Sequence, residues 1–157
     1  MILQPQVGVG IMFWRDGKVL AGKRKGLHGE GCYGWPGGHL ELGESIADCV
    51  RREALEETGL EVHGFSVACV YNMVAHDRHY LDIEVSVSSY SGEPVVMEPD
   101  RIESWDWYDI DNIPTPMFAA CTQAVRAVRI PGASFRIIDS NLQDISYIGE
   151  DGYMPSL

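Results

Sequence analysis

The stretch GHLELGESIADCVRREALEETGL, residues 38–60, decides the fold of this 157-residue chain. Its central run from Ile46 to Thr58 contains neither glycine nor proline. Glu44 or Ser45 can serve as the N-cap before this run, and Gly59 can end it. The sequence therefore predicts a helix over 46–58.

One face of this predicted helix changes from apolar to acidic along its length. At about 100° per residue, Ile46, Cys49 and Val50 share a face that should point into the protein. The same sector then continues with three carboxylates, those of Glu53, Glu56 and Glu57. Converging carboxylates repel one another and lose hydration, so the sector needs a cation, and Mg²⁺ suits oxygen ligands. The alternative is a charged helix end neutralised by Arg51 and Arg52.

The stretch resembles the Nudix box, G-x5-E-x7-R-E-U-x-E-E-x-G-U, in which U is an apolar residue. The matching positions are Gly38, Glu44, Arg52, Glu53, Ala54, Glu56, Glu57, Gly59 and Leu60. Seven fixed identities at fixed spacing carry the resemblance, and the one departure is the small Ala54 where a larger aliphatic residue is usual. The resemblance disfavours the alternative of a neutralised helix end.

Composition predicts one globular domain over 1–157. The chain is 45% hydrophobic and 22% charged, and it is long enough to bury a sizeable core. We expect a cytoplasmic protein, because the first residues lack the pattern of a secretory leader and no run approaches the ~18 apolar residues of a membrane span. Four widely spaced cysteines, Cys32, Cys49, Cys69 and Cys121, indicate neither a zinc site nor a disulfide framework.

The net charge of −11 restricts the partners that we expect. It disfavours nonspecific attraction to a nucleic-acid polymer or to an anionic membrane. A phosphate-bearing substrate is compatible with this acidity through bound divalent ions, which invert the local charge. Local positive charge is concentrated at residues 23–25, where Arg24 either contacts phosphate or belongs to a solvated loop.

The segments before the box predict a hairpin and a glycine-rich loop. Residues 7–13 and 19–23 are expected to form strands joined by a turn at 15–18, and residues 26–34 a loop at the cleft. In the following WPGGH segment, Gly37 and Gly38 permit a tight backbone path. Trp35 either stacks on a base or belongs to the core. His39 is either a general base or, as we favour, a polar side chain that lines the cleft and binds phosphate.

The segments after the box predict the remaining layers. Strands are expected at 62–71, 80–87 and 104–108, and a helix over 117–130 should cover the far side of the sheet. His76 and His79 are expected to flank a polar loop rather than to bind metal. For residues 131–157 an extra strand, a dimer contact and a loose tail remain open.

The pattern of predicted strands and helices is that of an α/β or α+β protein, an α/β/α sandwich with a mixed central sheet. The Nudix fold, whose core would cover about 7–128, agrees with it.

Three further segments are similar to the MutT-like branch of the Nudix family, close to the member that hydrolyses thiopurine nucleoside triphosphates. They are residues 22–26, 35–41 and 103–107. This resemblance implies hydrolysis of a normal, modified or oxidised (deoxy)nucleoside triphosphate to the monophosphate and pyrophosphate, with Mg²⁺ or Mn²⁺ as cofactor. It also makes a homodimer plausible.

The same resemblance implies roles for individual residues. The metal ligands would be Glu53, Glu56, Glu57 and the backbone of Gly38. Arg52 would orient Glu53, and Glu44 would form a hydrogen bond to residues that lie behind the metal ligands. Substrate contacts would come from Arg24, Trp35, Gly37 and His39, and loops 72–80 and 114–118 would influence substrate choice. The general base stays open between the box residues Glu53 and Glu56, which we favour, and the later Glu98 and Glu103.

Two other functions remain as alternatives. An ADP-ribose or nucleotide-sugar pyrophosphatase would share the metal site and differ in the base pocket. Residues 75–78 lack the proline and the tyrosine that ADP-ribose and diadenosine-polyphosphate enzymes tend to carry there. A non-catalytic domain that senses a nucleotide would normally have lost box acids, and all four are present here.

Overall fold

The computed structural model describes residues 4–26, 29–75, 78–129 and 136–139. The box forms helix α1 (Ile46–Thr58) as predicted. Ser45 is the N-cap, because its Oγ accepts a hydrogen bond from the Asp48 amide at 3.1 Å. Gly59 ends the helix with a left-handed φ of 72°, and its amide donates to the Leu55 carbonyl at 3.0 Å. The local signals therefore set both ends of this helix.

Replacing Gly59 with alanine is expected to lower the free energy of unfolding by about 1 kcal/mol, because an L-residue resists the left-handed conformation. A Cβ at this position would meet only Met97, at ordinary contact distance of 3.8 Å, so the cost is conformational. Urea denaturation of Gly59→Ala measures it. Gly64→Ala is the matched control, since a Cβ there meets nothing within 4 Å. Equal stability of the two variants would contradict the prediction.

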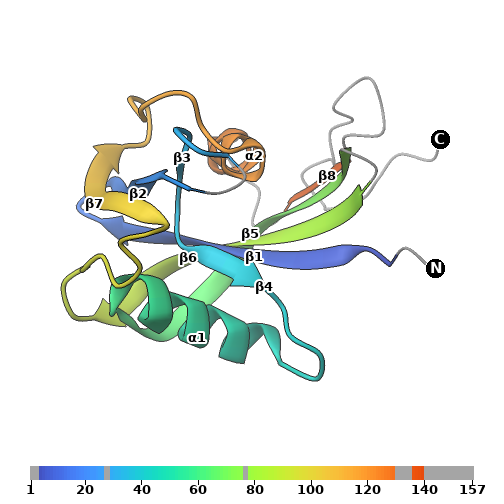
Figure 1. The fold of residues 1–157 in the computed structure, drawn as a ribbon, viewed down its shortest axis with the longest axis horizontal. Coiled ribbons are helices and arrows are strands. Elements are labelled where there is room, and N and C mark those ends of the chain that lie inside the picture. Colours follow the sequence, from blue (N-terminus) through green and yellow to red (C-terminus); the bar gives the residue numbers. More distant parts are fainter. Residues whose placement is uncertain (1–3, 27–28, 76–77, 130–135, 140–157) are drawn as a thin grey trace.

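Within the described residues, an eight-stranded mixed sheet forms the centre of the fold (Figure 1). The strands are β1 (Gln6–Arg15), β2 (Lys18–Arg24), β3 (Tyr33–Gly34), β4 (Gly37–His39), β5 (Glu61–Ala75), β6 (Arg78–Ser91), β7 (Ile102–Asp109) and β8 (Arg136–Asp139). Their order is β3-β2-β1-β6-β5-β8, with β4 paired to β1 and β7 paired to β2. The β1–β6 and β5–β8 pairs are parallel and the other pairs are antiparallel. The predicted mixed sheet is confirmed.

Helices cover both faces of this sheet (Figure 1). Successive side chains of a strand point to opposite faces, so Ile11 and Phe13 of β1 pack in the core beside α1, whereas Met12 packs in the core beside α2 (Ala119–Val128). The α/β/α sandwich is therefore confirmed. Neither helix is long and apolar enough, among the described residues, to cross a membrane.

Several elements differ from the sequence-based expectation. Ile46 is 36% exposed rather than buried, because the core that α1 contributes begins at Cys49. The second helix begins at Ala119 instead of 117. Residues 136–139 form the extra strand that was one of three alternatives, and the remainder of 131–157 lies outside the described residues apart from these four. His79 belongs to β6 and lies 2.6 Å from Oδ1 of Asn72, whereas His76 is outside the described residues.

Candidate active site

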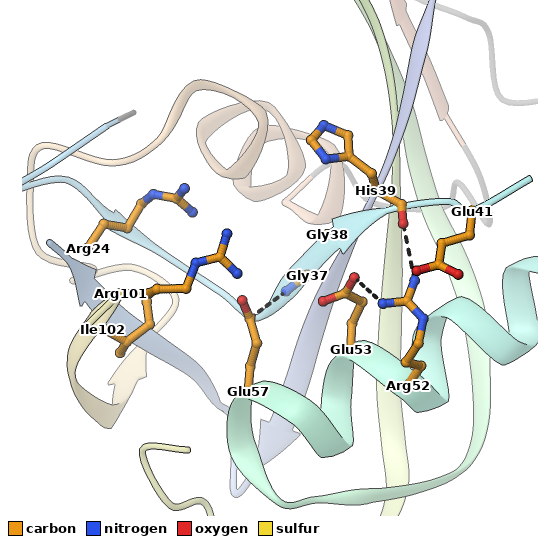
Figure 2. Close-up of a pocket in the computed structure, with 10 residues that line it drawn as sticks. All are labelled: Arg24, Gly37, Gly38, His39, Glu41, Arg52, Glu53, Glu57, Arg101 and Ile102. Carbon is orange, nitrogen blue, oxygen red and sulfur yellow. Dashed lines mark hydrogen bonds and ion pairs between the residues drawn. The ribbon is translucent and has the colours of Figure 1, made fainter. Parts of the chain in front are cut away.

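A cleft of about 300 Å³ lies where α1, β4, the end of β2 and the start of β7 meet (Figure 2). It is lined by Arg24, Gly37, Gly38, His39, Glu41, Arg52, Glu53, Glu57, Arg101 and Ile102. Most of the residues predicted for the site are in this set. The positive charges of three lining arginines offset the negative charges of three lining glutamates. The cleft can therefore admit an anion although the whole chain is strongly acidic.

Glu53 and Glu57 form the acidic wall of the cleft. They lie one turn apart on α1 and face β4, and Glu53 is only 9% exposed. The Gly37 amide donates a hydrogen bond to Oε2 of Glu57 at 2.9 Å. Gly38 passes so close to Glu53 that a Cβ on it would overlap the Glu53 carboxylate. Both glycines are therefore required sterically, Gly38 because a Cβ would overlap the Glu53 carboxylate and Gly37 because a Cβ would overlap the Val9 carbonyl oxygen of β1.

Burial raises the pKa of Glu57 to about 7. The Gly37 amide opposes this shift, and the negative charges of Glu53 and Glu98 reinforce it. Near neutral pH this carboxyl is thus poised between its protonated and ionised forms. A divalent cation beside it would favour the ionised form, which is the form that binds metal.

Arg52 connects the acidic residues on the outer side of the cleft. Its guanidinium donates to both carboxylate oxygens of Glu44, at 2.8 and 2.9 Å, and to Oε1 of Glu53 at 2.6 Å. It also donates to the His39 carbonyl at 3.2 Å. These bonds from Arg52 are the main reason why the pKa of Glu44 is lowered to about 2. Arg52 therefore lies where the sequence placed it, in contact with Glu53.

Glu56 does not converge with Glu53 and Glu57 as the helix geometry suggested. Its side chain is 55% exposed and lies 3.4 Å from Arg52. The reason is that Arg52, one turn earlier, attracts it toward the solvent side of α1, away from β4. Across the described ranges, no three His, Cys, Asp or Glu residues lie at the spacing of metal ligands.

The donor set nevertheless fits a magnesium ion. Mg²⁺ commonly takes only one or two protein carboxylates and completes its shell with water and substrate phosphates. Glu53, Glu57 and the backbone of Gly38 offer hard oxygen donors along one edge of the cleft, and the glycine backbone lies against the Glu53 carboxylate. These three residues would hold the ion, and Glu56 as a further ligand stays a prediction.

Two arginines form the opposite, basic wall. Figure 2 shows the guanidinium groups of Arg24 and Arg101 extending toward Glu57 and Gly37. Arg24 stacks on Phe118, with its guanidinium carbon 4.8 Å from the ring centre, while Arg101 lies 3.3 Å from Glu98. Arg101 was not among the site residues predicted from the sequence. Its only signal was its position after the Met-Glu-Pro-Asp turn, just before the strand that flanks the cleft.

The candidates for general base are separated by the fold. Glu53 lines the cleft. Glu98 lies close enough to raise the pKa of Glu57 by its charge, and it pairs with Arg101. Glu103 is 58% exposed, pairs with Lys23 at 3.6 Å and does not line the cleft. The geometry therefore favours Glu53 and Glu98 over Glu56 and Glu103.

Trp35 and His39 lie on the two ends of the segment that contains the glycine pair. Trp35 is 5% exposed in the core beside α2, so the structure shows the core alternative rather than an open stacking surface. Its Nε1 donates to Oε2 of Glu84 at 2.6 Å. His39 is exposed and lines the cleft, but its ring points away from Glu53 and Glu57 (Figure 2).

Glu84 is buried at 2% exposure, and burial raises its pKa to about 7. A carboxyl with a raised folded-state pKa stabilises the fold below its ordinary pKa of 4.5, and this contribution is lost as the pH rises to about 7. We therefore expect wild type to lose about 3 kcal/mol of unfolding free energy relative to Glu84→Gln between those pH values. Urea denaturation of both proteins across this range measures the difference. A constant difference would contradict the prediction.

The mixed sheet between two helices, with a cleft lined by acidic residues of α1, defines the class of protein to which this chain belongs. The chain belongs to the NUDIX domain family, whose model matches residues 4–126. It is a Nudix hydrolase.

Relatives with assigned activities differ in substrate. An ADP-ribose pyrophosphatase of Methanocaldococcus jannaschii is 32% identical over 120 residues, which are 75% of this chain and 70% of that protein. An oxidized purine nucleoside triphosphate hydrolase of Danio rerio is 31% identical over 66% of this chain and 66% of that protein. The crystal structure of a MutT NUDIX hydrolase from Burkholderia pseudomallei superposes with a TM-score of 0.76 at 36% identity, over 80% of this chain and 98% of that one.

Proposed function

We propose that the protein hydrolyses a (deoxy)nucleoside triphosphate, of the modified or oxidised purine type, to the monophosphate and pyrophosphate. The observation that carries this proposal is the pair of facing walls. Glu53 and Glu57 lie on α1, and Arg24 and Arg101 lie across the cleft from them. A volume of about 300 Å³ is at the low end for ligand sites, so we assign the cleft to the phosphates and place the base outside it.

Each wall has a separate task in this proposal. Arg24 and Arg101 bind the phosphate oxygens and counter the negative charge that develops on the leaving pyrophosphate. Glu53, Glu57 and the Gly38 backbone would hold the cation, which would supply Lewis-acid catalysis and a lowered pKa of water. Arg52 fixes Oε1 of Glu53 and so orients this carboxylate, and the proton acceptor is either Glu53 or Glu98.

The choice of a purine triphosphate rests on similarity. The segments 22–26, 35–41 and 103–107 resemble the MutT-like enzymes, including the member that acts on thiopurine nucleotides. The zebrafish relative, named for oxidized purine nucleoside triphosphates, supports the same class. From the resemblance we also propose a cytoplasmic homodimer, and light scattering during gel filtration tests the dimer.

ADP-ribose is the second candidate substrate, and the relative from Methanocaldococcus jannaschii favours it. ADP-ribose also presents a pyrophosphate, so the two walls could act on it in the same way. The difference must then arise where the base or the second ribose is bound, outside the cleft.

A substrate panel separates these functions. Canonical, oxidised, methylated and thio-substituted purine triphosphates are assayed beside ADP-ribose with Mg²⁺ or Mn²⁺, and products are separated by chromatography. We expect one modified triphosphate to exceed ADP-ribose in kcat/KM and to release pyrophosphate. Faster cleavage of ADP-ribose to AMP and ribose 5-phosphate would establish the second candidate. Absence of turnover on every compound would favour the nucleotide-sensing alternative.

A further inference from the structure

Strand β6 carries two acidic side chains, Asp82 and Glu84, on the sheet face covered by α2. Glu84 is among the most deeply buried side chains of the described chain, at 2% exposure. Its neighbours across the sheet are Gly10 on β1 and Cys69 on β5. Burying a carboxyl group is costly unless it is hydrogen-bonded, so this residue needs a structural reason.

The sheet register places a glycine of β1 beside Glu84, so the Glu84 side chain can extend across β1. Glu84 pairs with Gly10, and Gly10 in turn pairs with Gly37 of β4. A Cβ on Gly10 would lie 2.7 Å from Cδ of Glu84, so only glycine leaves this space. The Glu84 side chain therefore extends over β1, and its Oε2 accepts the indole N–H of Trp35 at 2.6 Å.

A similar arrangement occurs two residues earlier on β6. Asp82 pairs with Gly8, and Gly8 pairs with His39. A Cβ on Gly8 would overlap the Asp82 carboxylate. Burial raises the pKa of Asp82, and the charge of His39 opposes that shift. Acidic residues of β6 thus lie beside both ends of the segment from Trp35 to His39.

The segment from Trp35 to His39 is held to β1 by backbone pairing, in which the Pro36 carbonyl also accepts the Ile11 amide at 2.8 Å, and the Trp35 indole adds a side-chain anchor. Strand β4 has three residues, pairs with β1, and two of the three residues are glycines, which have the greatest backbone freedom. On its other side the segment supplies the Gly37 amide to Glu57 and the Gly38 backbone to Glu53. If β4 were displaced, its contacts with the Glu57 and Glu53 carboxylates would therefore be displaced as well.

We propose that Glu84 is a positioning residue of the active site, which acts through the Trp35 indole to fix the backbone of Gly37 and Gly38 against Glu57 and Glu53. The hydrogen bond anchors the residue two positions before Gly37, on the face of the sheet opposite α1. The inference rests on the proposed function only for the kcat measurements in its test; the exchange measurements do not depend on it.

Three variants and one spectroscopic signal test the proposal. Trp35→Phe removes the donor and keeps an aromatic ring, Glu84→Met removes the acceptor at similar length, and Glu84→Gln keeps an acceptor. Hydrogen exchange of the Gly37 amide, followed by NMR, reports the contact with Glu57 directly. We expect Trp35→Phe and Glu84→Met each to speed this exchange and to lower kcat about tenfold with KM little changed. Glu84→Gln should stay within about twofold of wild type.

Two comparisons distinguish an effect on the position of Gly37 and Gly38 from a general loss of protein stability. The double variant of Trp35→Phe and Glu84→Met should lose little more kcat than either single variant, because both remove one shared bond. Tyr90→Phe is the matched control on the same strand, since it removes a hydrogen bond to the Trp14 carbonyl, at 3.3 Å, away from β4. It should lower stability without changing Gly37 exchange.

The proposal is overturned if Trp35→Phe and Glu84→Met reduce the melting temperature but leave Gly37 exchange at the wild-type rate. This outcome is distinguishable from failure of the proposed function. If no nucleotide is hydrolysed, the exchange rate still decides whether Glu84 positions the glycine pair.

Discussion

Glu57→Gln is expected to lower kcat for pyrophosphate release by about a thousandfold. The glutamine keeps a carbonyl oxygen that can accept the Gly37 amide, but it cannot supply the negative charge that holds a divalent cation. The fold should tolerate the change, because burial already raises the pKa of Glu57 to about 7 and so favours an uncharged side chain. We therefore expect an inactive and fully folded protein, with weakened Mg²⁺ binding measured by calorimetry.

The control for this variant is Glu61→Gln, at the exposed first residue of β5. It removes the same charge four positions later in the chain, outside the cleft, and should keep wild-type kcat. Glu53→Gln should be as damaging as Glu57→Gln. Mg²⁺-dependent pyrophosphate release that survives both Glu53→Gln and Glu57→Gln would refute the proposed site.

Arg52→Met is expected to lower kcat about a hundredfold and to reduce the melting temperature. Arg52 contacts Glu44, Glu53 and Glu56, and the side chains of Glu44 and Glu53 are each only 12% exposed. Without the guanidinium, Glu53 loses the bond that orients it and remains partly buried without that counter-charge. The loss should fall mainly on kcat, because Arg24 and Arg101, which bind phosphate in our proposal, lie on other elements.

The adjacent Arg51 provides a close control. Its side chain is 56% exposed and lies 3.7 Å from Asp48, so Arg51→Met should have little effect on kcat or melting temperature. If Arg51→Met and Arg52→Met were equally active, the orienting role of Arg52 would be wrong.

The pH dependence gives a second test of Arg52. Because its bonds lower the pKa of Glu44 to about 2, their stabilising effect is present above the ordinary pKa of 4.5 and is lost as the pH falls toward 2. The difference in melting temperature between wild type and Arg52→Met should therefore shrink over this acidic range. A difference that does not change with pH would contradict the pairing with Glu44.

Local sequence signals were sufficient for the helix and for part of its chemistry. The cap at Ser45, the stop at Gly59 and the inward direction of Cys49 and Val50 depend on neighbours within one or two turns. Helical periodicity also placed Glu53 and Glu57 on one wall. It failed for Glu56, whose exposed side chain lies beside Arg52 and does not line the cleft.

Contacts between distant segments could not be read from spacing. Arg101 faces the box glutamates across a chain separation that no local pattern encodes. In the sequence, Leu81, Ile83, Val85 and Val87 alternate with polar residues, and this pattern by itself predicts an exposed position for Glu84. The structure buries Glu84 on the face of β6 that α2 covers, where it accepts the Trp35 indole N–H.

The sequence by itself determined the family, the acidic helix over 46–58 and the alternating strands, because these features depend on residue type and on fixed spacing along one element. Tertiary structure alone decided that Glu53 and Glu57 face the glycine pair while Glu56 does not. It also decided that Arg24 and Arg101 form the opposite wall and that Glu84 reaches Trp35 across Gly10. The physical reason is that strand register and helix placement bring these side chains together, and both depend on packing between residues that are remote in the chain.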